Sequence, residues 1–148
     1  MKNVSFWVLP ALIATSVFAH QGASGIVLER MQSMEALSTS MKSLSPIVRG
    51  QEAFDADTIA PFLPALNHLT AEQMVAYFPT GTDGGTSEAA ETIWSDAAGF
   101  AAEAQAFEAS VATLSAAVEA GEADGFNSAF RSVAGSCKSC HQSYRISK

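Results

Sequence analysis

Three residues near the carboxyl end of the chain, Cys137, Cys140 and His141, have types and a spacing that can do chemistry. They form the pattern Cys-x-x-Cys-His, in which two thiols make thioethers with a porphyrin and the adjacent imidazole ligates its iron. On a helix, residues three apart share a face, so both thiols can reach neighbouring edges of one ring. His141 follows Cys137 by four residues and lies beside the same face. The motif therefore predicts one covalent haem c, with His141 as the proximal axial ligand of iron.

Three other interpretations of this motif compete with haem attachment. A redox-active cysteine pair of the thioredoxin type expects a preceding strand and a βαβ setting, and the sequence indicates neither. A structural zinc site needs four ligands, and the only other histidines are His20 and His68. The third is a chance match of a short pattern. Because the chain has no further cysteine, no disulfide can join distant parts of the fold, and stability must come from packing or from a cofactor.

The spacing of apolar residues predicts the helices that must position this motif. Three stretches carry apolar residues at alternating intervals of three and four, and another is rich in apolar residues. In chain order the four expected helices are residues 26–48, a stretch from Asp55 or Asp57 to about Tyr77, a helix capped by Ser87 that ends at Gly121, and a last helix capped by Asp124. Pro61 and Pro64 should delay or break the second helix. We call the row of apolar residues along one face of a helix its seam. The seam of the last helix includes Cys137, Cys140 and Tyr144, so both cysteines should face the core.

These four helices predict an all-α fold. Residues 78–87 are dense in turn formers and form the one long loop, while the other connections are short. Because no stretch shows β-type alternation, we expect an antiparallel up-down-up-down four-helix bundle in a single domain. Bundles of this kind build cofactor sites from facing helices, so the haem should lie in the core. The first helix is then the wall opposite the motif.

Two residues in the seam of the first helix, Arg30 and Met34, are candidates for the site. A buried arginine needs a paired charge, and a haem propionate would supply it. The alternative is an arginine that snorkels from the seam to solvent. Met34 could be the distal axial ligand of iron, although methionine in a helix seam usually fills the core.

Trp94 and Arg145 are further candidates for haem contacts. We expect Trp94 to be a haem-side or core aromatic whose indole nitrogen needs an acceptor. Arg145 follows His141 by four residues and lies on the same side of the helix. It could tune the proximal side of the iron electrostatically, or be a solvated cation at the end of the helix.

The amino end of the chain has the features of an export signal. Residues 1–19 combine Lys2 with an apolar stretch and small residues before His20, the pattern of a secretory signal peptide. The run is short for a membrane span and is broken by Pro10, so we expect cleavage, a mature domain of residues 20–148 and no stable membrane insertion. Losing Lys2 leaves 7 basic and 15 acidic residues, a formal charge of −8. Such a surface repels nucleic acid and suits redox partners with basic docking surfaces, or simply keeps the protein in solution.

Over residues 26–147 the chain resembles the class II c-type cytochromes, the cytochrome c prime family. The shared marks are Arg30 followed four residues later by Met34, then Phe78-Pro79-x-Gly81-Thr82, Ile93-Trp94 and Cys137-x-x-Cys140-His141-x-x-Tyr144-Arg145. The resemblance implies a haem with His141 as proximal ligand, homodimers built through the first helix, and a periplasmic location.

The family divides on the distal side of the haem. High-spin members leave the iron five-coordinate and bind small gases such as nitric oxide, whereas low-spin members use a methionine as sixth ligand and transfer electrons. Met34 falls at that position, Arg30 is typical of the high-spin group, and methionine also occurs in some high-spin members. We therefore expect a mono-haem cytochrome for one-electron transfer, with a high-spin protein that binds or buffers nitric oxide as the alternative. We do not expect an enzyme such as a peroxidase, since no distal histidine and arginine pair is placed to cleave an O–O bond.

Overall fold

The structure is a computed structural model that describes residues 22–146 of the 148-residue chain. Helices dominate this part of the chain, and it contains no β-strand beyond an isolated bridge between Ala89 and Arg145. The predicted signal peptide, residues 1–19, lies outside the described residues. No helix within residues 22–146 is long and apolar enough to cross a membrane.

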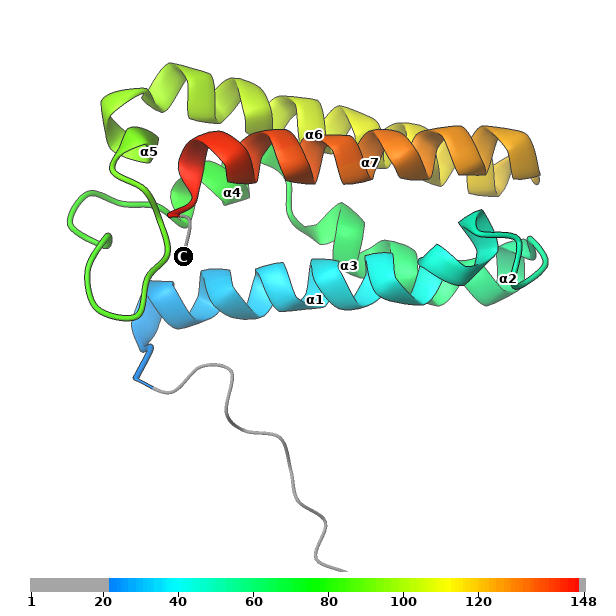
Figure 1. Cartoon of the computed structure of the whole chain (residues 1–148), viewed down its shortest axis with the longest axis horizontal. Helices are drawn as coiled ribbons and strands as arrows, with labels where there is room; N and C mark the ends of the chain where they lie inside the picture. The colour runs from blue at the N-terminus through cyan, green and yellow to red at the C-terminus, as the bar shows by residue number, and fades with distance from the viewer. Residues whose placement is uncertain (1–21, 147–148) are drawn as a thin grey trace, which may run out of the picture.

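The helices run alternately in opposite directions (Figure 1). In chain order they are α1 (Gly25–Val48), α2 (Ala56–Ile59), a 3₁₀ helix (Ala60–Phe62), α3 (Leu63–His68), α4 (Ala71–Ala76), α5 (Thr92–Ser95), α6 (Ala97–Glu119) and α7 (Ala123–Tyr144). The short helices α2 to α4 together return along α1, and α6 and α7 follow as a long antiparallel pair that lies side by side. The predicted all-α, up-down-up-down four-helix bundle is confirmed.

The first helix, α1, ends close to the predicted residue. Leu37, Leu44 and Ile47 are buried, and Pro46 lies inside the last turn. The amide of Gly50 then donates to the carbonyl of Ile47 (2.9 Å) with a φ of +69°, a conformation that suits glycine because it has no Cβ. The turn after α1 is therefore set by local sequence.

The second helix of the bundle is broken into short pieces, where the sequence predicted one continuous helix with a slow or broken start. Pro61 lies in the first turn of the 3₁₀ helix and Pro64 in the first turn of α3, where a missing amide hydrogen costs nothing. Another break precedes α4. There the hydroxyl of Thr70 accepts a hydrogen bond from the Gln73 amide (3.2 Å), and the Gln73 side chain accepts one from the Thr70 amide (3.1 Å). This capping box starts a new helix.

The third helix of the bundle, α6, begins later than predicted. Its N-cap is Asp96, whose carboxylate accepts a hydrogen bond from the Gly99 amide (3.1 Å). Ser87 does not cap this helix, and the short helix α5 precedes α6 as a separate turn. The prediction was wrong here because Ser87 is used elsewhere, as an acceptor for Arg30.

The connection between α6 and α7 is short. Gly121, with a φ of +69°, ends α6 as predicted, and the Glu122 amide donates back to the carbonyl of Ala117 (3.1 Å). Glu122 is also the N-cap residue of α7, so Asp124 lies in the first turn and is not the cap. Most residues of the predicted seams of α6 and α7 are buried in one core, which includes Phe100, Phe107, Val111, Leu114, Val118, Phe126 and Val133. Phe130, Cys137 and Cys140 are partly buried against this core, and Ala97 at the start of α6 is exposed.

Candidate haem site

A cavity of about 990 Å³ lies between α1 and α7 and extends to α6. Met34 and Leu37 line it from α1, Phe100 and Phe107 from α6, and Phe130 from α7. Protein interiors are normally close-packed, and small-molecule sites run to roughly 300–1,000 Å³. A largely apolar space of this size inside a small bundle therefore fits a large, flat, apolar cofactor such as a porphyrin.

Cys137, Cys140 and His141 all border this cavity from α7. Both cysteine side chains are half-buried and packed against the hydrophobic core, as the seam of the last helix predicted. His141 is exposed where it borders the cavity. The three residues of the motif thus lie on one wall of one cavity, which is the arrangement that attachment of a single ring requires.

The two thiols are held in their protonated form. Burial raises the pKa of Cys137, and burial together with the Glu103 carboxylate and the other thiol raises the pKa of Cys140 to about 11. A thioredoxin-type cysteine needs a lowered pKa to supply a thiolate, so this environment argues against that interpretation. Across residues 22–146, no three His, Cys, Asp or Glu side chains come together to hold a metal ion, which argues against a structural zinc site.

The imidazole of His141 is favoured in its neutral form. The cavity walls partly desolvate the imidazolium and lower the pKa of His141, and the positive charge of Arg145 lowers it further. Glu88 acts in the opposite direction and raises the pKa. Neutral imidazole is the form that ligates a metal, so the electrostatics of the site suit a ligand role.

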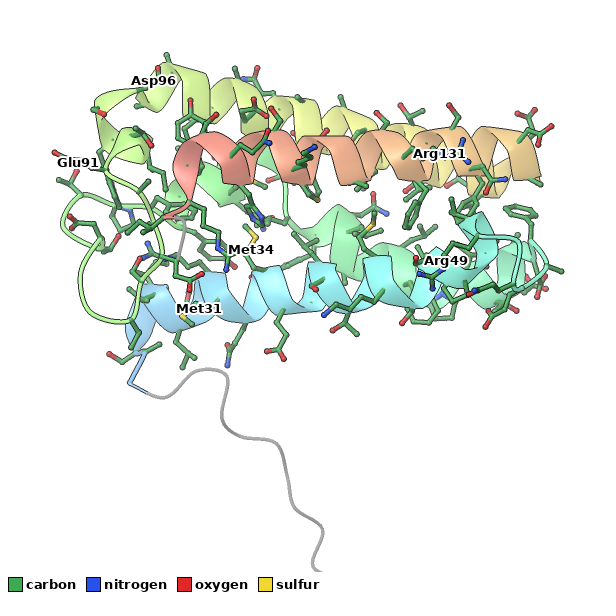
Figure 2. The ribbon with its side chains drawn as sticks, in the orientation of Figure 1. Met31, Met34, Arg49, Glu91, Asp96 and Arg131 are labelled. Carbon is green, nitrogen blue, oxygen red and sulfur yellow. The ribbon has the colours of Figure 1, made fainter. Side chains whose placement is uncertain are left out.

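Met34 borders the cavity from α1, the helix on the side opposite α7. Its side chain is half-buried and points into the space between α1 and α7 (Figure 2). Three other methionines, Met31, Met41 and Met74, border the same cavity. The cavity therefore brings together Met34 and His141, which lie 107 positions apart in the sequence.

Arg30 is buried, with only 4% of its surface exposed, and it also borders the cavity. Its guanidinium donates to the hydroxyl of Thr82 (3.1 Å), to the carbonyl of the same residue and to the hydroxyl of Ser87. It also lies 4.7 Å from the centre of the Phe78 ring. Burial lowers the pKa of Arg30, and the nearby Asp83 partly offsets this effect. The snorkelling interpretation of Arg30 is therefore wrong, because the side chain turns inward and holds the loop of residues 78–87.

Trp94 is half-buried but is not among the residues that line the cavity. Its indole nitrogen donates to the carbonyl of Phe78 (2.9 Å), which confirms the expectation that it needs an acceptor. Phe78 borders the cavity and packs edge-to-face against Phe100, with ring centroids 5.0 Å apart. Trp94 is thus placed to act on the cavity through Phe78 and not by direct contact.

Arg145 borders the cavity next to the motif and is paired with an acid. Its Nε donates to a carboxylate oxygen of Glu88 (2.8 Å), and its Nη2 donates to the same oxygen. The backbone reinforces this contact, since the amide of Ile146 donates to the carbonyl of Glu88 (2.9 Å). The cation at the end of α7 is therefore fixed in place, although its side chain is 53% exposed.

Sequence reasoning missed two polar contacts beside the motif. The Tyr144 hydroxyl donates to a carboxylate oxygen of Asp96 (2.7 Å), and the Ser139 hydroxyl donates to a carboxylate oxygen of Glu103 (2.7 Å). Asp96 accounts for much of the rise that takes the pKa of Tyr144 to about 12. The N-cap pattern of an aspartate three residues before Gly99 could have pointed to Asp96, but no local pattern indicated Glu103.

A four-helix bundle with a Cys-x-x-Cys-His motif on the wall of a central apolar cavity is a haem-binding bundle. The family model described as Cytochrome C' matches residues 25–145, so the chain belongs to the cytochrome c' family, whose members carry a c-type haem. It is a haem protein of the c type.

Relatives and solved structures agree with this membership. The chain is 39% identical to a cytochrome c' of Alcaligenes xylosoxydans xylosoxydans over 80% of its own length and 91% of that protein. It is 32% identical to a cytochrome c-556 of Agrobacterium tumefaciens (strain B2A), over 84% of this chain and all of that one. A nitric oxide complex of a mutant cytochrome c prime from Alcaligenes xylosoxidans has a TM-score of 0.76 and 38% identity, covering 83% of this chain and 94% of that one.

Proposed function

We propose that this protein is an exported, periplasmic mono-haem cytochrome that transfers single electrons. Cys137 and Cys140 would form the thioethers, His141 would be the proximal ligand, and Met34 would be the distal ligand. One observation carries the proposal: the attachment motif on α7 and a methionine on α1 border the same apolar cavity. No enzymatic reaction is part of the proposal.

The residues of the cavity suit such a carrier. The haem, when bound, supplies the one-electron couple. The phenylalanines of the cavity wall would exclude water from its faces, and a methionine in the distal position would leave no open site for other ligands. Arg30 would place a positive charge near a propionate while remaining bound to the loop, and Arg145 would hold a positive charge on the proximal side. Trp94 would fix Phe78, and through it the packing of the cavity wall.

Binding of nitric oxide is the second candidate function. Solved structures similar to this chain include nitric oxide complexes of cytochrome c prime from Alcaligenes xylosoxidans, at 37–38% identity. In that case Met34 would act as a steric gate over an open distal position. The two functions place the same residues in the same cavity and differ only in whether the Met34 sulfur is bound to iron.

Absorption spectra of the ferric and ferrous protein separate the two functions. For the electron carrier we expect a low-spin spectrum with a methionine-to-iron charge-transfer band that is lost in Met34→Ala. Met41→Ala is the matched control, because Met41 borders the same cavity from the same helix, and it should keep the band. A high-spin spectrum of the unmodified protein with rapid nitric oxide binding would instead establish the gas-binding function.

Attachment of the haem is tested by mass spectrometry. Cys137→Ser combined with Cys140→Ser should remove the haem mass from the denatured chain, because no other thiol is present to form a thioether. His141→Ala should keep the covalent mass but lose the proximal ligand, which would change the spectrum of the ferrous protein. Covalent haem on the double serine variant would contradict the assignment of both cysteines.

Export and assembly complete the proposal. Cleavage before His20 would give a mature chain of residues 20–148, and its charge of −8 suits a redox partner with a basic docking surface. We further propose a homodimer built through α1, no binding of nucleic acid and no stable membrane insertion. Mass spectrometry of the protein from a periplasmic fraction and its sedimentation velocity would check the cleavage site and the dimer.

A further inference from the structure

The last turn of α7, which carries His141, is tied to the segment before α6. The Thr92 hydroxyl donates to the carbonyl of Ser143 (2.7 Å), and the Ala90 amide donates to the carbonyl of Tyr144 (3.1 Å). The last carbonyls of a helix have no partner within the helix. Residues 88–96 supply hydrogen-bond donors for these carbonyls of α7. The end of α7 therefore does not fray freely but is held by a neighbouring segment.

One carboxylate joins the end of α7 to the start of α6. Asp96 lies at the start of α6 (Figure 2). One oxygen of its side chain accepts a hydrogen bond from the Gly99 amide (3.1 Å), and the other accepts one from the Tyr144 hydroxyl (2.7 Å). Tyr144 is buried, with 8% of its surface exposed, and its ring packs edge-to-face on Phe100. Hydrogen bonds to a charged acceptor are among the stronger ones in proteins.

Gly99 is required by the close approach of these two side chains. A Cβ atom at position 99 would lie 2.2 Å from a carboxylate oxygen of Asp96 and 2.4 Å from the Tyr144 hydroxyl. Both distances are far inside van der Waals contact, so any side chain at this position would push the two groups apart. The glycine is therefore explained by the hydrogen bond beside it.

We infer that Asp96, Gly99 and Tyr144 form a lock that positions His141 in the cavity. Tyr144 borders the cavity and lies three residues after His141, on the same turn, so its hydrogen bond to Asp96 fixes where that turn stands relative to α6. The three residues of the lock are positioning residues and act through His141. The inference rests on the proposed function insofar as His141 is taken as the iron ligand.

The first test asks whether the lock exists, by a readout that does not depend on iron ligation. Gly99→Ala is compared with Gly125→Ala, because each glycine is the third residue of a long helix. At position 125 the nearest atom would be 3.2 Å away, at the end of the flexible Glu122 side chain. Alanine is the better helix former, so the control should be at least as stable as the unmodified protein.

Gly99→Ala should instead be less stable, and amide hydrogen exchange of residues 141–145 should become faster by about tenfold or more. Tyr144→Phe should give the same local loss of protection, and Asp96→Asn, which keeps an acceptor oxygen, should fall between it and the unmodified protein. Equal stability of the two alanine variants, with unchanged protection of residues 141–145, would overturn the lock.

The second test asks whether the lock positions the ligand or only stabilises the fold. In the ferrous haem-loaded protein carrying Met34→Ala, which leaves the iron five-coordinate so that the iron–imidazole stretching band appears in the resonance Raman spectrum, this band should shift when Tyr144→Phe or Gly99→Ala is added. It should not shift in Val133→Ala, which removes buried apolar volume from the same helix away from the lock. Loss of stability without a shift of the band would overturn the positioning role. Absence of the band from the Met34→Ala protein would overturn both the ligand role of His141 and its positioning. The exchange test would still report on the hydrogen bonds of the lock.

Discussion

Glu103 is a negative charge on the wall of the haem cavity, next to the attachment motif. It borders the cavity from α6, accepts a hydrogen bond from Ser139 (2.7 Å) and contributes to the raised pKa of the Cys140 thiol. The net charge around a haem is one of the factors that set its reduction potential. A carboxylate in this position should stabilise the oxidised, more positive form of the cofactor.

Glu103→Gln should therefore raise the midpoint potential, because it removes the charge and keeps an acceptor for Ser139. An interaction of about 1 kcal/mol at intermediate dielectric corresponds to a rise of roughly 40 mV for a one-electron couple. Glu108→Gln is the control, since Glu108 lies on the same helix but is not part of the cavity lining. A redox titration of both variants checks the prediction, and equal shifts in the two would contradict it.

At the scale of elements, the loop of residues 78–87 is held against α1 by Arg30. The guanidinium bonds to Thr82 and Ser87 and lies over Phe78, so one side chain fixes both ends of the loop. The planar fork of an arginine matches several acceptors at once, which a lysine ammonium on a flexible stem does not. Phe78 in turn holds the cavity wall through Phe100. The loop is thus a structural part of the haem site.

Arg30→Lys should destabilise the fold by roughly 2 kcal/mol, since it leaves buried acceptors without their donors. It should also make the loop sensitive to limited proteolysis. Arg49→Lys is the matched control, because Arg49 is exposed just after the end of the same helix (Figure 2), and it should change stability by less than about 0.5 kcal/mol. Chemical denaturation gives the stability of each variant. Proteolysis that spares the loop in Arg30→Lys would show that other contacts hold it.

At the scale of the whole molecule, the cavity leaves apolar side chains of α1, α6 and α7 without packing partners inside the bundle. Its volume is about 990 Å³, whereas protein interiors normally contain few voids larger than a water molecule. We therefore expect a bound haem to be a structural component of the core, and the bundle not to keep the same packing without it.

The double variant Cys137→Ser, Cys140→Ser, freed of haem, should keep much of its helix content but lose fixed tertiary packing. We expect retained far-ultraviolet and reduced near-ultraviolet circular dichroism, with binding of a hydrophobic dye. The haem-loaded protein is the control and should show cooperative unfolding with no dye binding. Fully cooperative unfolding of the haem-free chain near the same temperature would show that the bundle closes the cavity by itself.

The sequence by itself determined the features that depend on neighbouring residues. The spacing of Cys137, Cys140 and His141 places them on one helix face, and this alone predicted their common wall. The periodic apolar positions predicted the seams of α1, α6 and α7, and Gly50 and Gly121 marked the ends of two helices. These predictions succeed because hydrogen bonding within a helix and the burial of one face are set by residues within a few positions of each other.

Only the tertiary structure decided the contacts between residues far apart in the chain. Ser87 has the type and context of an N-cap, yet it binds Arg30, and Asp96 caps α6. Trp94 reaches the cavity only through Phe78, and the Asp96 carboxylate meets a hydroxyl 48 residues away in Tyr144. No local pattern encodes such pairs, because which side chain satisfies a buried donor or acceptor depends on which helices pack together and in what register. The motif thus predicted where the haem is attached, whereas the packing of α1 and the start of α6 against α7 decided what surrounds the motif.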